Sequence, residues 1–284
     1  MKPSSSTDNF RAYCCSLDEL NAAVEGIHQG LPERWTLPTN FSSGGKEKLH
    51  ALLERNDEVI AACSRGGDGP RLLAARHDRP DPSVVELMAM FNAIGGDGGL
   101  VVSRQLEANA RSANAALGGR PLFEHMPLRL YRFPREHVDR LQQDPRPVLR
   151  TPGAGDSEAL AGFLDRFGVE TGLGAPDNTD QAVEEAIDRG GIRMLEQEGA
   201  LLAIAQRGMT PSVGQVRIGL VYVPERYRRM GHAATIVRAI TLEVINDDIA
   251  PCLFTDAANE GTDALYKSIG YEPLEELVHL NPEP

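Results

Sequence analysis

Three arginines, Arg226, Arg228 and Arg229, lie within four positions of a chain whose formal net charge is −12. An apolar segment precedes them and ends at Pro224, which cannot donate to a sheet, and Gly231 follows them. Glycine lets a backbone approach a ligand closely, and the N–H groups that begin a helix favour an anion there. The pattern predicts an anion site that a diphosphate fits. Taken alone, the spacing also allows an exposed loop with three solvated arginines.

The neighbouring elements strengthen the anion-site hypothesis. Residues 216–223 form an apolar run typical of a buried strand, and 233–245 have apolar residues at helical spacing. Ala233 is small enough to leave the start of this helix uncluttered. We expect His232 to pack in the loop rather than to act in catalysis.

A second group of chemically able residues follows the next apolar segment. Residues 252–255 are expected to form a strand, and Asn259 comes shortly after it. A helix over 262–269 would present Tyr266, and Gly270 would end it. An amide and a phenol are thus expected beyond the end of a second strand.

Taken together, residues 216–271 resemble the GNAT superfamily of acetyl-CoA-dependent N-acetyltransferases. The segment Arg228-Arg-Met-Gly-His-Ala233 is similar to the family's Arg/Gln-x-x-Gly-x-Gly/Ala pyrophosphate loop. The residues Asn259, Ala264-Leu-Tyr266 and Gly270-Tyr271 are similar to its Asn…Ala…Tyr…Gly-Phe/Tyr element. The resemblance extends over about 148–280, whereas 1–145 is only loosely similar to the degenerate GNAT-like N-terminal halves of some two-part members.

The resemblance implies an α/β fold, with a mixed central sheet flanked by helices in the C-terminal domain and a GNAT-like α/β N-terminal domain. It also implies that strand 216–223 splays from strand 252–255 to admit acetyl-CoA. The amine would attack directly in a ternary complex, Tyr266 would protonate the departing thiolate, and Asn259 would hydrogen-bond the pantetheine or the Tyr266 region. The implied cofactor-binding residues are Val221, Tyr222, Val223, Arg228, Arg229, Met230, Gly231, His232, Ala233, Ala234, Asn259 and Tyr266.

Several roles stay open at this point. Tyr266 could instead be a packing tyrosine on a short helix, and Tyr222 could either line the acceptor site or pack. Many relatives have a Glu on the strand before the loop, but residues 215–222 contain no carboxylate. The base could be a side chain elsewhere or a water relay, or the amine could bind already neutral. The side chains considered for the base are Asp256, Glu196 and Glu198.

Composition limits the possible partners. The chain has 41 Asp and Glu against 29 Lys and Arg, and most of the excess lies in 146–284. A duplex nucleic-acid binder needs surplus cations, so nucleic acid is not expected as a partner, and neither is an anionic membrane. The acidic half is instead a hint that the acetyl acceptor is a small cationic amine or peptide. The oligomeric state cannot be inferred.

Motifs for other chemistry and for targeting are missing from the sequence. The four cysteines and seven histidines show no CxxC, HxxxH or HExxH spacing, so no metal is expected. The polar N-terminus differs from a signal peptide, and no apolar run reaches the length of about 18 residues that spans a membrane. These patterns favour the cytoplasm.

The chain divides into an expected disordered segment, 1–10, and two α/β domains, 11–145 and 146–284, with a Pro-rich linker near 134–147. The second domain is expected to have the order βααβββαβαβ. In the first domain we expect strands and helices in a broadly similar order, including a short helix over 46–55. Besides an N-acetyltransferase, the sequence allows a non-catalytic acyl-CoA-binding or regulatory protein, and a protein N-terminal or lysine acetyltransferase.

Overall fold

The computed structural model describes residues 9–28, 48–66, 70–76, 81–96, 99–142, 147–171, 178–188, 190–208 and 215–283. Most of the segment expected to be disordered, 1–8, and part of the expected linker, 143–146, lie outside the described residues. The chain forms two compact units, which are 1–128 with 275–284 (unit 1) and 129–274 (unit 2). The expected domains, 11–145 and 146–284, stay a prediction.

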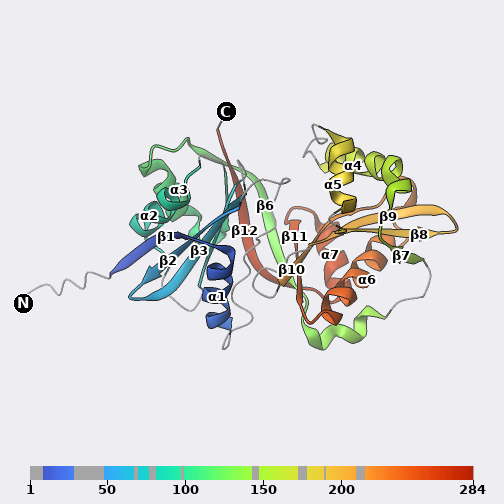
Figure 1. Cartoon of the computed structure of the whole chain (residues 1–284), viewed down its shortest axis with the longest axis horizontal. Helices are drawn as coiled ribbons and strands as arrows, with labels where there is room; N and C mark the ends of the chain where they lie inside the picture. The colour runs from blue at the N-terminus through green and yellow to red at the C-terminus, as the bar shows by residue number, and fades with distance from the viewer. Residues whose placement is uncertain are drawn as a thin grey trace, which may run out of the picture. The chain divides into compact units, whose positions relative to one another are not determined.

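Unit 1 has a mixed sheet with the strand order β1-β2-β3-β4-β5-β12 (Figure 1). The first four strands pair antiparallel, β4 and β5 pair parallel, and β12 pairs antiparallel with β5. Its core packs α2 and α3 against the sheet through side chains such as Leu87, Phe91 and Ala110. The elements are β1 (Phe10–Cys15), α1 (Leu17–His28), β2 (Lys48–Arg55), β3 (Glu58–Gly66), β4 (Arg71–Ala75), α2 (Val84–Ile94), β5 (Leu100–Ser103), η1 (Arg104–Leu106) and α3 (Glu107–Ala116).

Unit 2 has a second run of strands in the order β6-β11-β10-β9-β8-β7. The core of α6 against this sheet contains Ile236, Val237 and Ile240, and a separate cluster packs α4 and α5 around Phe163. The elements are η2 (Arg135–Leu141), β7 (Val148–Arg150), η3 (Ala154–Asp156), α4 (Ser157–Thr171), α5 (Thr179–Asp188), β8 (Ile192–Gln197), β9 (Ala200–Arg207), β10 (Gln215–Tyr222), η4 (Glu225–Tyr227), α6 (His232–Asn246), β11 (Ala250–Asp256) and α7 (Glu260–Ile269).

Two strands are divided between the units. β6 (Leu122–Arg132) has its last residues, from Arg129 on, in unit 2, and β12 (Glu272–Pro282) has its residues from Glu275 on in unit 1. Residues 277–280 of β12 pair with 100–103 of β5. The chain therefore completes the sheet of unit 1 only with its final strand.

The expected mixed α/β fold and the order βααβββαβαβ from β7 to β12 are confirmed. The expected helix over 46–55 is wrong, because Lys48–Arg55 is strand β2. This segment is buried without a break over 50–54, and a strand enclosed in a sheet satisfies that pattern better than an amphipathic helix does.

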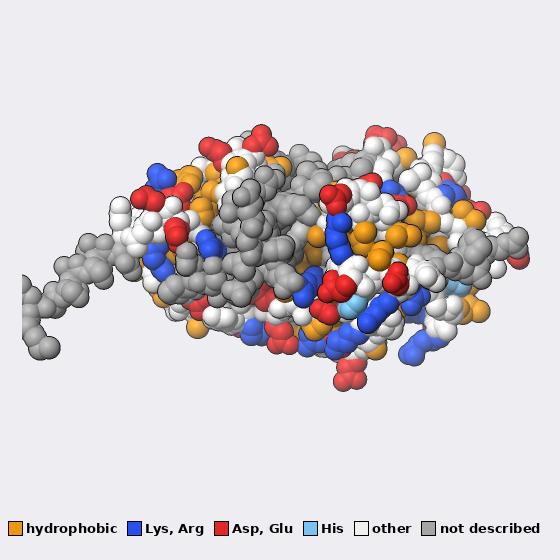
Figure 2. All heavy atoms as spheres, turned by 90° about the horizontal axis from the view of Figure 1, so that it is seen from below, with side chains coloured by type: hydrophobic (Ala, Val, Ile, Leu, Met, Phe, Trp, Pro, Cys, Tyr) orange, Lys and Arg blue, Asp and Glu red, His pale blue; other side chains and the backbone are white. Residues whose placement is uncertain are grey.

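The described surface mixes charge signs. On the face drawn in Figure 2, acidic and basic side chains lie among apolar ones rather than in separate fields. Within the described part of the chain, no helix is both long and apolar enough to cross a membrane.

Candidate acyl-transfer site at the ends of β10 and β11

The adjacent parallel strands β10 and β11 part from each other near their carboxyl ends. Their paired residues run from Gln215 with Ala250 to Ile218 with Leu253, although each strand continues beyond that point. On the other side of β10, the register with β9 shifts between Gly219 and Tyr222. A bulge of this kind bends the strand and takes backbone groups out of the ladder. The ladder between β10 and β11 therefore ends before the strands do, as the splay implied by the family resemblance requires.

The helix that follows β10 has an open N-terminus. Gly231 caps α6 in the left-handed conformation with φ 86°, and no side chain hydrogen-bonds to the cap. A Cβ built at Gly231 would meet no heavy atom within 4 Å. The first turn of α6 contains no acidic residue, and its N–H groups have no partners within the helix. These groups can bind an anion together with the dipole of a four-turn helix.

Arg228 points back toward β10. Its Nε donates to the Val223 carbonyl oxygen at 2.9 Å, and its Nη2 pairs with the carboxylate of Glu170 on α4. The guanidinium also lies over the Tyr222 ring, 5.8 Å from the centroid. The hydrogen bond that Arg228 donates to Glu170 raises the pKa of Arg228. Of the two arginines expected to meet a diphosphate, Arg228 is thus engaged inside the protein.

Tyr222 is a packing residue in the described contacts. Its side chain is 5% exposed and meets Phe163 and Phe167 edge-on, with ring centroids 5.6 and 6.3 Å away. Its hydroxyl donates to Glu170 at 2.7 Å, and burial together with this bond raises the pKa of Tyr222. Of the two roles that the sequence left open for Tyr222, its environment matches packing.

Tyr266 lies on α7 with 6% of its surface exposed. Its ring centroid is 5.9 Å from that of Tyr131 and 6.2 Å from that of Tyr271. Burial raises the pKa of Tyr266 to about 12, and the positive charge of Arg217 on β10 opposes this rise. The phenol is therefore fully protonated at neutral pH, which is the form that a proton donor needs.

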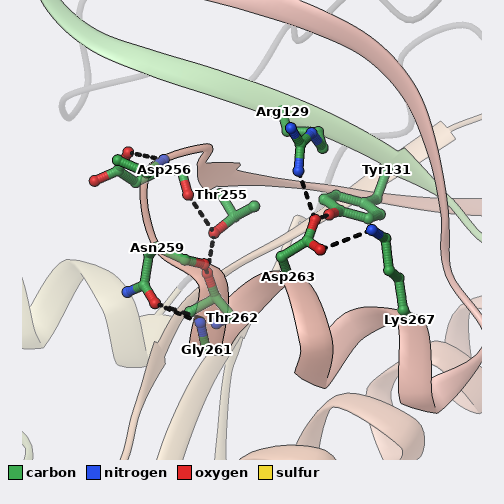
Figure 3. Close-up of polar contacts among 10 residues, drawn as sticks. Arg129, Tyr131, Thr255, Asp256, Asn259, Gly261, Thr262, Asp263 and Lys267 are labelled. Carbon is green, nitrogen blue, oxygen red and sulfur yellow. Dashed lines mark hydrogen bonds and ion pairs between the residues drawn. The ribbon is translucent and has the colours of Figure 1, made fainter.

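The start of α7 is tied down by polar contacts, which Figure 3 shows. The Asn259 side-chain oxygen accepts from the backbone N–H groups of Gly261 and Thr262 at 3.1 and 3.2 Å, so Asn259 is the N-cap. The hydroxyls of Thr255 and Thr262 lie 2.5 Å apart and link β11 to the helix. The side-chain oxygen of Asn259 thus holds the start of α7, and the contact of Asn259 with pantetheine stays a prediction.

A cluster that the sequence did not indicate surrounds Asp263, one turn before Tyr266 (Figure 3). Its carboxylate binds Lys267 and Arg129 at 2.7 Å each and also accepts from the hydroxyl of Tyr131. The Lys267 and Tyr131 hydrogen bonds lower the pKa of Asp263 far below its ordinary range. Asp263 is therefore unsuited to be a general base, and it fixes α7 to β6.

Of the three carboxylates considered for the base, two have partners within the protein and the third lies in a turn. Asp256 accepts from the Ala258 backbone N–H at 2.8 Å in the turn after β11. Glu196 pairs with Arg150 at 2.7 Å, and Glu198 lies in the β8–β9 turn with φ 52°. Glu196 and Glu198 line a cavity of about 360 Å³ at the β7–β8 edge. Strands β9 and β10 lie between the β7–β8 pair and β11. Neither Glu196 nor Glu198 therefore lies between the ends of β10 and β11.

Arg217 occupies the strand that lacks a carboxylate. It stacks over Phe254 of β11, with the guanidinium carbon 5.5 Å from the ring centroid, and burial lowers the pKa of Arg217. The sequence shows that this strand has no carboxylate, but it gives no signal that the Arg217 cation is buried there.

The structure brings the two predicted motifs to one edge of the sheet. Because β10 and β11 are parallel neighbours, the loops after them leave the same edge, and α6 packs against α7. The segment from the end of β10 through the loop into α6 carries Val221, Tyr222, Val223, Arg228, Arg229, Met230, Gly231, His232, Ala233 and Ala234, and the segment after β11 leads to Asn259 and Tyr266. His232 meets Tyr227 edge-on at 6.3 Å, which agrees with packing in the loop.

Comparisons with known proteins agree with this architecture. Residues 196–280 match the family described as FR47-like protein. Over 97% of this chain and 100% of the other, the fold is similar to a GNAT-family acetyltransferase from Colwellia psychrerythraea, with 16% identity and a TM-score of 0.59. A Drosophila protein gives 14% identity and a TM-score of 0.70 over 98% of this chain and 99% of the other.

A tandem GNAT protein from the clavulanic acid biosynthesis pathway is similar over 97% of this chain and 99% of its own, with 12% identity and a TM-score of 0.55. A search of curated proteins found no match. At these identities the solved structures establish a common fold, which is the fold that the sequence motifs predicted.

Proposed function

We propose that this chain, which has the GNAT fold and matches the FR47-like family over 196–280, is a GNAT acetyltransferase that transfers an acetyl group from acetyl-CoA to a primary amine. One observation carries the proposal. The paired residues of β10 and β11 end at Ile218 and Leu253, and α6, the helix that follows β10, has neither a side-chain cap nor an acid at its N-terminus. An opening in a sheet beside an anion site fits a ligand with an extended arm and a diphosphate.

In this proposal, the N–H groups at the start of α6 bind the diphosphate, and Arg229 adds its charge. Arg229 has φ 64° and is exposed, and the described contacts give it no ion pair. The bulged backbone of 219–222 would lie beside the thioester, where free N–H groups can polarise the carbonyl. Holding the amine and the thioester together supplies much of the rate enhancement.

Tyr266 is proposed as the acid that protonates the departing thiolate. A phenol with a pKa of about 12 is a weaker acid than a thiol with a pKa of about 8.5, so proton transfer from Tyr266 to a hydrated thiolate is unfavourable. The transfer becomes more favourable when the thiolate forms in a site where water cannot hydrate it. The positive charge of Arg217 eases this transfer because it lowers the pKa of Tyr266.

The amine is proposed to react without a carboxylate base. The acidic excess of 146–284 attracts a cationic amine or peptide from solution. Close to Arg217, however, an ammonium group is disfavoured, so its pKa falls and the neutral nucleophile is more populated. Attraction at long range and deprotonation at short range can thus act on the same acceptor.

A direct test measures binding and turnover separately. Calorimetry with acetyl-CoA should give a Kd, and a thiol reagent should detect CoA release when small amines, amino-terminal peptides and lysine peptides are added in turn. Acceptors that are peptides would favour the protein N-terminal or lysine acetyltransferase. A protein that fails to bind acetyl-CoA would refute the proposal.

A second candidate is a non-catalytic acyl-CoA-binding or regulatory protein. It is favoured by the partners of Glu196 and Asp263, because these carboxylates form ion pairs with Arg150 and Lys267 rather than facing an incoming amine. Tight binding of acetyl-CoA without CoA release for any amine between pH 6 and 10 would support this candidate over the enzyme.

A further inference from the structure

Glu170 joins three parts of the candidate site. It lies one residue before the end of α4, and its carboxylate uses both oxygens. Oε1 accepts from the Tyr222 hydroxyl at 2.7 Å, and Oε2 pairs with Arg228. The helix α4 is thereby connected to the end of β10 and to the loop before α6.

The direction of the Arg228 side chain limits what it can do. A guanidinium presents its donors in a planar fork, and here Nε binds the Val223 carbonyl oxygen while Nη2 binds Glu170. Both contacts lie on the β10 side of the loop. A guanidinium held in this way ties the loop to its own strand and to α4, so that two of its three nitrogens already have partners within the protein.

We propose that Glu170 is a positioning residue of the cofactor loop. It holds Arg228 as a brace between α4, Val223 and the loop, so that the first-turn N–H groups of α6 and Arg229 are the groups that meet the diphosphate. The proposal rests on the proposed function, because it assigns roles within the acetyl-CoA site. It also transfers Arg228 from the ligand set that the family resemblance implies to the set that supports it.

The solvent exposure of Glu170 and Arg228 determines how much the loss of their ion pair should change the Kd for acetyl-CoA. The Glu170 and Arg228 side chains are 39% and 43% exposed, which is typical of pairs that contribute little alone. The Tyr222 hydroxyl, on a ring that is 5% exposed, shares the same carboxylate and adds a bond that solvent screens less. We therefore expect the loss of the brace to raise the Kd for acetyl-CoA about fivefold.

The experiment compares Glu170→Gln, Arg228→Gln and Arg228→Lys by calorimetry with acetyl-CoA. A brace predicts that all three weaken binding to a similar degree, and that the Glu170→Gln/Arg228→Gln double variant is no weaker than either single one. Lysine should fail to rescue, because a single ammonium cannot replace the fork that reaches Val223 and Glu170 together. The Michaelis constant for acetyl-CoA should rise while kcat is preserved.

The opposite assignment gives opposite signs. If Arg228 binds the diphosphate and Glu170 competes for it, Glu170→Gln tightens binding, Arg228→Gln weakens it, and Arg228→Lys keeps most of the affinity. That result overturns the proposal. Glu184→Gln on α5 is the matched control, since it removes the same charge from an exposed site in the same unit and should leave the Kd unchanged.

A wild-type protein that binds no acetyl-CoA would refute the proposed function, and the brace would then be judged by urea unfolding. Glu170→Gln and Arg228→Gln should be non-additive in their effect on the free energy of unfolding, because they remove the same interaction. Additive effects would overturn the brace whether or not acetyl-CoA binds.

Discussion

Helices α2 and α6 follow the third strand of the β-meander in their respective units, yet their N-termini are built in opposite ways. Ser83 caps α2, and Glu86 accepts from the Ser83 backbone N–H at 2.8 Å in a complete capping box. Glu86 is 4% exposed and pairs with Arg55 at 2.6 Å. At α6 the cap is Gly231, and neither a side chain nor an acid serves the first turn.

Helices α3 and α7, which follow α2 and α6 along the chain, also differ at one position. Both α3 and α7 have ten residues and begin with Glu, at positions 107 and 260. Counted from those starts, the seventh residue is the buried Ala113 in α3 and Tyr266 in α7. Unit 1 therefore has a methyl group where unit 2 has the candidate acid.

This difference teaches that a repeated element order does not imply a repeated site. In unit 1, a carboxylate of the chain itself occupies the position at which an external anion would bind a helix N-terminus. In unit 2, the same position is left for a ligand. Acetyl-CoA is thus expected to bind unit 2 only, with a stoichiometry of one per chain.

The difference between the N-termini of α2 and α6 can be tested by giving α6 the capping residues of α2. The double substitution Gly231→Ser/Ala234→Glu places the two capping-box residues at the same positions relative to the helix start, and the box forms when the introduced serine moves from the φ of 86° at Gly231 to the extended conformation that Ser83 has. The introduced carboxylate would bind the N–H groups at the start of α6 and repel the diphosphate. The Kd for acetyl-CoA should therefore rise about a thousandfold, since charge-assisted hydrogen bonds contribute about 1.5–3 kcal/mol each. Calorimetry measures the loss.

Because Ala234 is buried, the control for this graft is Gly231→Ser/Ala234→Gln, which has the same bulk without the charge. It should retain much more affinity than the Glu variant. Equal affinities for the two variants would mean that charge at this terminus does not govern binding, and the contrast between α2 and α6 would lose its functional meaning.

The difference between α3 and α7 can be tested at the phenol. Tyr266→Phe keeps the packing against Tyr131 and Tyr271 but removes the proton, so we expect kcat to fall about a hundredfold with little change in the Kd for acetyl-CoA. Single-turnover assays separate the two quantities. Since the pKa of Tyr266 is raised to about 12, the wild-type rate should show no loss from this group below about pH 10. A Phe variant with full activity would leave Tyr266 as a packing residue.

The closed terminus of unit 1 should contribute stability rather than binding. Burial opposes ionisation of Glu86, but hydrogen bonds from Arg55 and Ser83 outweigh it and lower the pKa of Glu86. A lowered pKa gives stability that is present above the unfolded value, near about 4.3, and is lost as the pH falls through the folded value. Glu86→Gln should therefore cost about 2 kcal/mol at pH 7.

Urea unfolding at pH 7 and pH 3 tests this expectation. The difference in unfolding free energy between Glu86→Gln and wild type should shrink at the lower pH, because wild-type Glu86 is then losing its charge as well. A difference that is the same at both pH values would show that the Glu86 charge does not support unit 1. The Kd for acetyl-CoA should be unaffected.

Local patterns predicted the elements that form the site, because strand, loop and helix each have a sequence signal there. The strand expected over 252–255 lies within β11, the helix expected over 233–245 lies within α6, and the loop around Gly231 lies where the spacing placed it. The strand Lys48–Arg55 was missed because Leu, Ala, Glu and Arg favour helices. The positive φ values of Asn56 and Asp57, 52° and 64°, mark the two-residue turn that makes it a hairpin strand.

Long-range pairs could not be predicted from one sequence. Glu170 is 58 positions from Arg228, and no local pattern marks a solvent-facing Glu near a helix end as the partner of a loop arginine. The pairing of β12 with β5, through Val278 and Val102, joins residues that are even more distant along the chain. Packing of whole elements decides such contacts, and periodicity reveals only which face of an element is buried.

The smallest expected effect separates backbone strain from ligand contact at the open terminus. Gly231 and Gly199 have φ of 86° and 77°, and a Cβ at either would meet no heavy atom within 4 Å. Alanine at each should therefore cost about 1 kcal/mol of stability through the left-handed conformation alone. Only Gly231→Ala should also weaken acetyl-CoA binding, several-fold, because its methyl group lies where the ligand approaches. If calorimetry shows the same Kd for both variants, the N-terminus of α6 does not contact acetyl-CoA, and the distinction between the two units must come from another part of unit 2.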